Sequence, residues 1–248
     1  MERRTYLKGI TVSVGGISLA GCNGDNQNED YPSGFSGNGL NPKLVIDNQV
    51  NILSSARVDY SFEMTINGNK NVQERTKFAD TSIPTYFTTI DTASEQKENY
   101  YLDGKEYSRK LVQTEDGEAE EFNTEEKEFT PKDAFSLDTI NGVLKKADWS
   151  DVEEDFLDGE EVIKYVVTSM NDLSEGNVFF VEENALEEVR EVYIEVIANK
   201  ETGQLYEATA NVDVSLTTGS DVKYDFSQTY SEVNSAEVQE PDWYSEQF

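Results

Sequence analysis

The chain has 248 residues, of which 50 are Asp or Glu, 20 are Lys or Arg and none is His, so its formal charge at pH 7 is −30. The lack of histidine excludes a Ser-His-Asp triad, a Cys-His pair and His-containing zinc sites. A nucleic-acid partner is not expected, because so acidic a surface repels phosphates. Carboxylates in this excess keep a protein soluble when salt screens their charge, which predicts a halophilic protein.

The first 22 residues have the pattern of an export signal. Arg3 and Arg4 precede an apolar segment of about a dozen residues, shorter than the roughly 20 that a transmembrane helix needs. The segment ends in LAGC, and Cys22 is the only cysteine, so no intrachain disulfide can form. The stretch resembles a twin-arginine signal followed by the lipobox of bacterial and archaeal lipoproteins. The alternative is a buried N-terminal strand with a stray thiol.

The lipobox resemblance implies that Cys22 becomes the lipid-modified N-terminus of an exported protein. The protein would then be attached to the cell membrane through this lipid and face the extracellular side. Two long chains on one thioether hold a protein at a membrane stably, whereas a single acyl chain does not. With its acidic composition, the chain resembles the surface lipoproteins of salt-loving archaea.

A flexible tether is predicted over residues 23–41, which contain few apolar side chains and many turn formers. It separates the signal and lipobox at residues 1–22 from a single domain at residues 42–248. The domain begins with a short helix predicted over residues 42–56, where Pro42 suits the first helical position.

The next part of the domain predicts an antiparallel meander. From Asp59 onward, apolar side chains alternate with polar ones, which predicts a strand that ends at the turn signal Asn67-Gly68. The elements predicted next are strands at residues 72–79 and 84–91 and a hairpin at residues 98–112 around the dipeptide DG.

An amphipathic helix is predicted over residues 131–147. Thr130 suits the N-cap and Pro131 the first helical position, and apolar side chains recur behind them with helical spacing. The acidic residues 113–128 before this helix are predicted to be a loop, either a solvated flap or a decoration typical of halophilic proteins.

The last part of the domain predicts further strands with one apolar and one polar face. Such strands describe a sheet that is covered on one side and solvated on the other. They cover residues 160–169, 189–198, 205–216 and 222–230, and NKETGQ at residues 199–204 is a hairpin loop.

The order of these elements, the stretch NKETGQLYEA and a last strand running into VQEPDW are similar to the LolA/LppX/LprG-type lipoprotein fold over residues 43–243. The resemblance implies an α+β fold. Its strongly curved antiparallel sheet forms an open half-barrel, and one or more helices pack on the concave face around an apolar cavity.

The sequence carries no recognisable catalytic motif. It has no GxGxxG, GxxxxGK[ST] or DxDxDG pattern, and its only thiol is assigned to the anchor. Carboxylate pairs are expected by chance among 50 acidic residues. We therefore expect a monomer that is not an enzyme and that has no catalytic residue, no metal and no cofactor.

Two hypotheses for the function remain. The first is a carrier that holds a lipid or other hydrophobic ligand in the cavity, with the helix at residues 131–147 as a lid. The alternative is a structural or sensory surface module whose core is filled by its own side chains, without a small-molecule ligand. The candidate cavity-lining residues are Phe62, Met64, Tyr101, Leu137, Ile140, Leu144, Val192, Ile194, Val212 and Phe226.

Overall fold

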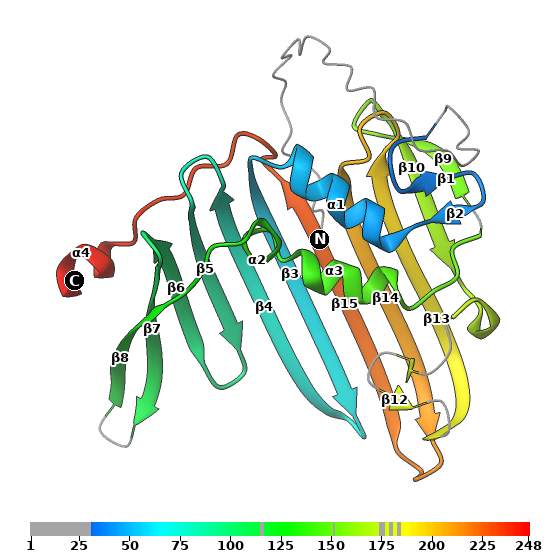
Figure 1. Cartoon of the computed structure of the whole chain (residues 1–248). Coiled ribbons are helices and arrows are strands. Elements are labelled where there is room, and N and C mark those ends of the chain that lie inside the picture. The colour runs from blue at the N-terminus through cyan, green and yellow to red at the C-terminus, as the bar shows by residue number, and fades with distance from the viewer. Residues whose placement is uncertain (1–30, 115–116, 151, 174–176, 179–180, 183–184) are drawn as a thin grey trace.

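A computed structural model describes residues 31–248, apart from residues 115–116, 151, 174–176, 179–180 and 183–184. Its main feature is an antiparallel sheet of 11 strands in the order β8-β7-β6-β5-β4-β3-β15-β14-β13-β10-β9. The sheet is open, since β8 and β9 are its two edges (Figure 1). The strands of this sheet are β3 (Ser55–Ile66), β4 (Asn69–Asp80), β5 (Thr85–Thr92), β6 (Gln96–Leu102), β7 (Lys105–Thr114), β8 (Gly117–Glu126), β9 (Val152–Leu157), β10 (Glu160–Val167), β13 (Leu186–Asn199), β14 (Leu205–Leu216) and β15 (Asp221–Ser231). Two small sheets pair β1 (Phe35–Ser36) with β2 (Gly39–Leu40) and β11 (Asn177–Val178) with β12 (Val181–Glu182).

Strands β3 to β8 follow one another in sequence and in space, which confirms the predicted meander. Both turn signals are also confirmed. Asn67 and Gly68 have φ angles of 50° and 82°, and Asp103 and Gly104 have φ angles of 51° and 81°. These left-handed conformations suit Asn, Asp and Gly and match the twist of the adjoining strands. On its other side β3 pairs with β15, so the strands of the large sheet that come first and last in the sequence are neighbours in space.

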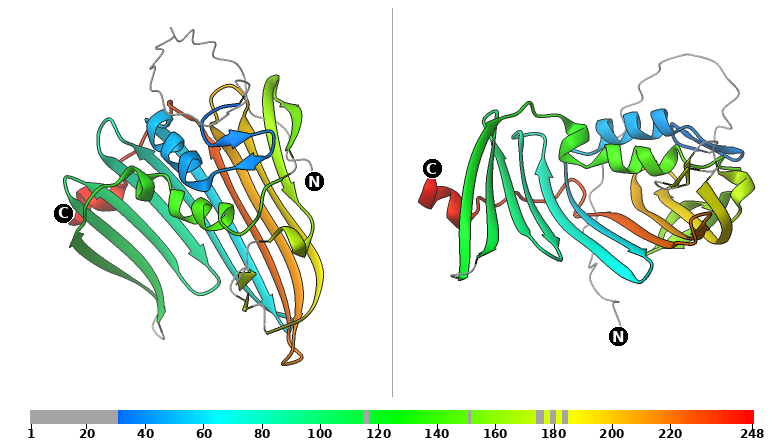
Figure 2. Two further views of the ribbon diagram at one scale, coloured as in Figure 1. Left: turned by 45° about the vertical axis from the view of Figure 1, so that its right-hand side comes forward. Right: turned by 90° about the horizontal axis from the view of Figure 1, so that it is seen from below.

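Two helices lie side by side on one face of the large sheet, which we call the helix-bearing face (Figures 1 and 2). They are α1, whose N-cap Asn41 accepts a hydrogen bond from the backbone of Leu44, and α3. The short helix α2 precedes α3 on the same face (Figure 1). The helix bounds are α1 (Pro42–Ile52), α2 (Pro131–Ala134), α3 (Leu137–Leu144) and α4 (Asp242–Gln247).

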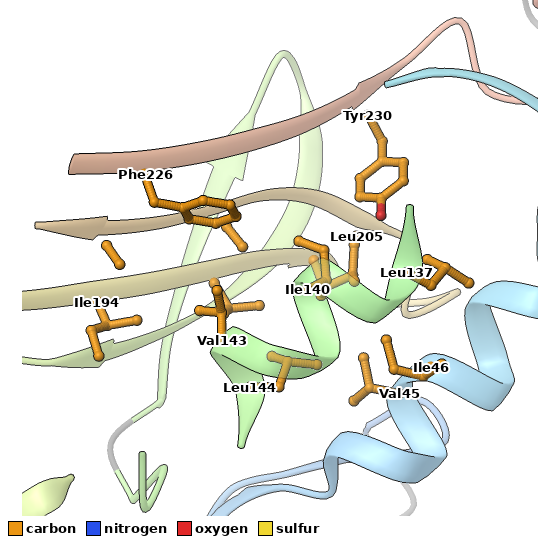
Figure 3. Packing of buried hydrophobic residues seen from close by; sticks show 14 of the residues in the cluster. Val45, Ile46, Leu137, Ile140, Val143, Leu144, Ile194, Leu205, Phe226 and Tyr230 are labelled. Carbon is orange, nitrogen blue, oxygen red and sulfur yellow. The ribbon is translucent and has the colours of Figure 1, made fainter. Parts of the chain in front are cut away.

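The main core lies between α1, α3 and the sheet. Figure 3 shows Val143 of α3 on the side of Ile194 and Phe226, while Leu144 is turned toward α1. Ile140 is fully buried, as are Leu137 and Leu144. Burial of such side chains contributes roughly 1.5–3 kcal/mol each, so this contact fixes α3 on the sheet.

The helix predicted over residues 131–147 is in fact two helices. Thr130 caps α2 as predicted, since its hydroxyl accepts a hydrogen bond from the backbone of Asp133. The helical path then breaks at Ser136, whose φ of 53° is left-handed. The break has a physical cause in the sheet, because the carbonyls of Asp133, Phe135 and Ser136 accept hydrogen bonds from sheet side chains.

The acidic residues 113–128 were predicted to be a loop, and this prediction is wrong for most of the segment. Residues 117–126 form the edge strand β8, which pairs with β7 along its whole length. The high density of glutamate suits this position, because charged side chains keep an exposed strand edge from pairing with another chain.

Residues 31–41, predicted as the end of the tether, pack on the domain in the structure. Phe35 is 3% exposed, and its ring centroid lies 5.9 Å from that of Tyr165. The Tyr165 hydroxyl donates to the Ser36 carbonyl oxygen at 2.6 Å. Gly39 has a φ of 140°, and a Cβ there would lie 2.2 Å from a neighbouring carbonyl oxygen. The packed domain therefore includes this hairpin.

The C-terminal helix α4 was not predicted. Its Tyr244 ring lies 5.0 Å from the ring of Tyr100 and 4.8 Å from that of Tyr107. Because side chains alternate along a strand and Tyr101 belongs to the main core, Tyr100 points to the opposite face. Helix α4 thus covers part of the face that α1 and α3 leave open.

Among the residues that the structure describes, no helix combines the length and apolarity that a membrane crossing requires.

Candidate functional site

The side chains of the helix-bearing face change character between β3 and β4. Directly paired residues of neighbouring strands place their side chains on the same face, so the strand register defines rows across the sheet. From β10 to β3 these rows are mainly apolar, and from β4 to β6 they are mainly polar. One row reads Ala208, Gln228, Tyr60, Arg75, Ile90 and Lys97, and the next reads Tyr230, Val58, Lys77, Thr88 and Asn99.

We call this boundary the seam. Its β3 side is apolar and half-buried at the rim of the main core. The ring of Phe62 lies 5.3 Å from that of Tyr224 in an edge-to-face contact, and the Arg75 guanidinium carbon lies 4.6 Å from the centroid of the Tyr60 ring. The seam includes the residues on both sides of this boundary. They are Gln228 on β15, Tyr60, Phe62 and Met64 on β3, Arg75 and Lys77 on β4, Thr88 on β5 and Asn99 on β6.

Polar side chains of the sheet hold the junction between α2 and α3. They come from β4 and β15, on either side of β3, and all three donate to backbone carbonyls. The junction is therefore attached to the sheet by hydrogen bonds as well as by apolar contacts. The pairs are Lys77 Nζ with the Asp133 oxygen at 2.5 Å, Tyr230 Oη with the Phe135 oxygen at 3.0 Å and Gln228 Nε2 with the Ser136 oxygen at 3.2 Å.

Four buried polar atoms of the seam have no hydrogen-bond partner within the described part of the chain. They are Arg75 Nε, Thr88 Oγ1, Asn99 Oδ1 and Gln228 Oε1. Thr88 is 3% exposed and Gln228 is fully buried. Buried polar groups in folded proteins nearly always have partners, so these four atoms are available to water or to another polar molecule.

Positive charge gathers at the same place. Burial, followed by repulsion from Arg75 and Lys127, lowers the pKa of Lys77 from 10.5 to about 7, against the attraction of Glu106 and Asp133. Lys127 Nζ lies 2.8 Å from the Glu106 carboxylate, which the Tyr86 hydroxyl also contacts. Within the described part of the chain, neither Arg75 nor Lys77 forms an ion pair.

The structure brings all ten predicted cavity-lining residues into one apolar cluster. Leu137, Ile140 and Leu144 have exposed fractions of 0%, so no water-sized space adjoins their side chains. Only Phe62 and Met64 are half-buried, and they belong to the seam. The buried remainder consists of Tyr101 on β6, Val192 and Ile194 on β13, Val212 on β14 and Phe226 on β15. Arg3, Arg4 and Cys22 lie outside the described residues.

A hollow lies at the turn between β13 and β14 and the neighbouring β9–β10 hairpin. It has a volume of about 670 Å³ and is lined by polar and charged residues. The carboxylate of Glu160 accepts hydrogen bonds from Asn199 and from the hydroxyl of Tyr206, and Lys200 pairs with Glu154 at 2.7 Å. Its polar groups thus largely bind one another.

No cluster of three or more acidic, His or Cys side chains among the described residues is arranged to hold a metal ion.

Comparison with solved structures finds distant likenesses. MucB, solved in complex with MucA(peri), aligns over 82% of this chain and 58% of its own length, at 10% identity and a TM-score of 0.30. A DUF1329 family protein from Desulfovibrio piger aligns over 76% and 92%, at 10% identity and a TM-score of 0.26. A beta-barrel-like DUF1849 protein from Brucella abortus aligns over 72% and 98%, at 10% identity and a TM-score of 0.22.

The chain therefore spans less than two thirds of the length of the MucB chain. No family model matches the sequence, and no curated protein sequence matches it. At such low TM-scores, these likenesses carry no function over to this chain.

The polar half of the seam was not predicted from the sequence. Arg75 and Lys77 stand two positions apart on one strand, in a chain with few basic residues. This spacing was the available signal, because residues two apart share a face of a strand. For Thr88, Asn99 and Gln228 the sequence held no such signal.

Proposed function

We propose that this protein is a non-catalytic lipoprotein that holds a lipid or other hydrophobic ligand on the helix-bearing face of its sheet. The observation that carries the proposal is the seam, where half-buried apolar side chains of β3 stand beside buried polar atoms without partners in the described chain. An amphiphilic molecule matches both halves, because its chain contacts the apolar side chains and its head group the polar ones.

In this proposal the helix-bearing face is the concave side of a half-barrel, as in the LolA/LppX/LprG-type fold that the sequence resembles. The α2–α3 segment is the lid. Its three hydrogen bonds to the sheet each contribute about 1 kcal/mol net. A hydrocarbon chain gains about 0.8 kcal/mol for each methylene that leaves water. Lifting the lid would also expose Leu137, Ile140 and Leu144, whose burial contributes roughly 1.5–3 kcal/mol each, so about 10–15 methylenes are needed to offset it. Such transfer requires no catalytic residue.

A binding experiment tests the carrier. The methyl ester of cis-parinaric acid, an uncharged polyene whose fluorescence rises in apolar surroundings, should bind the full chain saturably in molar KCl. Phe62→Ser should weaken this binding about tenfold or more, because it removes a phenyl ring worth roughly 1.5–3 kcal/mol of contact. The measurement is a fluorescence titration of both proteins.

Phe87→Ser is the matched control. Phe87 is also half-buried, on β5, but it points to the opposite face, so this variant should bind the ester as the natural chain does. Absence of saturable binding by the natural chain, or equal loss in both variants, would contradict a ligand site at the seam.

The alternative is a structural or sensory surface module with a filled core. The observation that favours it is the zero exposed fraction of Leu137, Ile140 and Leu144, which excludes a water-sized space against α3. The two functions differ at the seam, since the module requires no ligand there. The titration with the ester therefore decides between them.

The membrane anchor is part of the proposal. Export through the twin-arginine signal and a lipid on Cys22 would place the domain at the extracellular side of the cell membrane of a salt-loving archaeon. In such a host, Cys22→Ser should move the protein from the membrane pellet to the soluble fraction without lowering its melting temperature, because the described domain begins after this residue. Retention of the variant in the pellet after a high-salt wash would contradict the anchor.

A further inference from the structure

We infer that the ligand is an anionic amphiphile, whose carboxylate or phosphate group binds Arg75, Lys77 and Thr88 on the polar side of the seam. The inference rests on the proposed function for the apolar chain of the ligand and adds the chemistry of its head group. The positions, the burial and the charge of these three side chains support it.

The positions suit one oxyanion. Arg75 and Lys77 are two residues apart on β4, so their Cα atoms are separated by roughly 6.5–7 Å and their side chains share a face. Thr88 is the direct cross-strand neighbour of Lys77 on β5. The three side chains offer a guanidinium, an ammonium and a hydroxyl, the donors that bind carboxylate and phosphate oxygens in proteins.

The contacts of these groups within the described chain leave their charge without a counterion. Lys77 Nζ donates to the Asp133 carbonyl oxygen and lies 4.3 Å from the centroid of the Tyr86 ring, but neither partner carries a negative charge. Lys77 is 8% exposed and Thr88 is 3% exposed, while Arg75 Nε and Thr88 Oγ1 are buried without a hydrogen bond within the described chain. Two cations on one strand, neither in an ion pair there, repel each other. An anion between them removes this repulsion and satisfies the open donors, whereas an uncharged head group satisfies only the hydrogen bonds.

The acidic surface does not exclude an anionic ligand. At the molar salt in which a halophilic protein works, surface charges are screened within about 3 Å, whereas buried charges are screened much less. The ligand therefore meets the two cations of the seam rather than the net charge of −30. The carboxylates that act on Lys77 are those of Glu106 and Asp133, and Glu106 is engaged by Lys127 and Tyr86.

The test compares cis-parinaric acid with its methyl ester on the full chain at pH 7 in molar KCl. The acid and the ester share the same polyene chain and differ in the head group, which is a carboxylate in the acid and an uncharged methyl ester in the other. The acid should bind at least about tenfold more tightly, since charge-assisted hydrogen bonds stabilise a buried anion. Arg75→Gln should remove most of this preference and leave the affinity for the ester unchanged.

Arg57→Gln is the matched control. Arg57 also stacks on an aromatic ring, with its guanidinium carbon 5.4 Å from the centroid of Phe78, but it lies on the opposite face and is paired with Asp59. This variant should keep the preference for the acid.

Thr88→Val gives a second readout, because the Thr88 hydroxyl has no partner in the described chain. It should leave the melting temperature of the ligand-free protein unchanged or higher, while it weakens binding of the acid.

The outcomes separate the two proposals. Equal affinity for the acid and the ester would overturn the anionic head group and leave the carrier intact. Absence of binding by both would overturn the carrier itself. Displacement of the acid by millimolar inorganic phosphate, with no binding of the ester, would overturn the amphiphile and leave a site for a free anion.

Discussion

The free energy of unfolding should rise by about 2 kcal/mol between pH 7 and pH 9, and Lys77→Met should abolish most of this rise. Burial and the neighbouring cations lower the pKa of Lys77 to about 7 in the folded protein, against 10.5 for an ordinary lysine. Between these two values the unfolded chain binds a proton that the folded protein does not. Stability therefore increases with pH across this window and falls as pH drops toward 7.

The measurement is chemical denaturation of both proteins at pH 7, 8 and 9 in molar KCl. The window is well suited to the test, because the chain has no histidine to titrate in it. Above it, the raised pKa of buried tyrosines such as Tyr224 opposes the effect. Lys105→Met, at an exposed position where β7 begins, should keep the natural slope. Parallel pH curves for the natural chain and Lys77→Met would contradict a buried, easily deprotonated lysine.

Ile140→Ala should lower the free energy of unfolding by about 3 kcal/mol, within the usual range for truncating a fully buried aliphatic side chain. Ile140 has an exposed fraction of 0% and lies on the side of α3 that faces the sheet (Figure 3). Its removal leaves a new cavity, because neighbours on every side already touch it. Denaturant titration in molar KCl measures the loss.

Ile83→Ala is the matched control for Ile140→Ala. Ile83 lies in the turn between β4 and β5 and is 66% exposed, so the same change should alter stability by less than about 0.5 kcal/mol. A loss below about 1 kcal/mol for Ile140→Ala would mean that α3 lies over a preformed space. The proposed ligand site would then extend under α3 instead of ending at the seam.

The strands of this fold were predictable because their pattern is local. In β14 the even-numbered positions from Ala208 to Val214 are apolar and buried, and the odd-numbered ones between them are polar. The break at Ser136 was not predictable, since Lys77 and Tyr230, which bind the carbonyls around it, are far away in sequence. The same holds for α4, whose Tyr244 packs on strands more than half the chain away.

Of the two halves of the seam, only the apolar one could be predicted from the sequence. Phe62 and Met64 follow the alternation of β3, so sequence alone placed them on the apolar face. The strand that holds Arg75 and Lys77 has polar residues on both faces, so its pattern does not say which face meets the helices. Only the pairing of Tyr60 with Arg75 puts the guanidinium beside the apolar rim.

The position of β3 between β4 and β15 has a consequence for how the chain folds. Strand β4 follows β3 after a tight turn, whereas β15 follows all the other strands of the large sheet in the sequence. Pairing over such sequence distances gives a high contact order, which slows folding. Until β15 arrives, β3 has one free edge, the kind of edge on which incomplete chains associate. At low ionic strength, mutual repulsion between chains of charge −30 opposes this association, whereas molar salt screens the repulsion, so association of incomplete chains should increase with salt concentration.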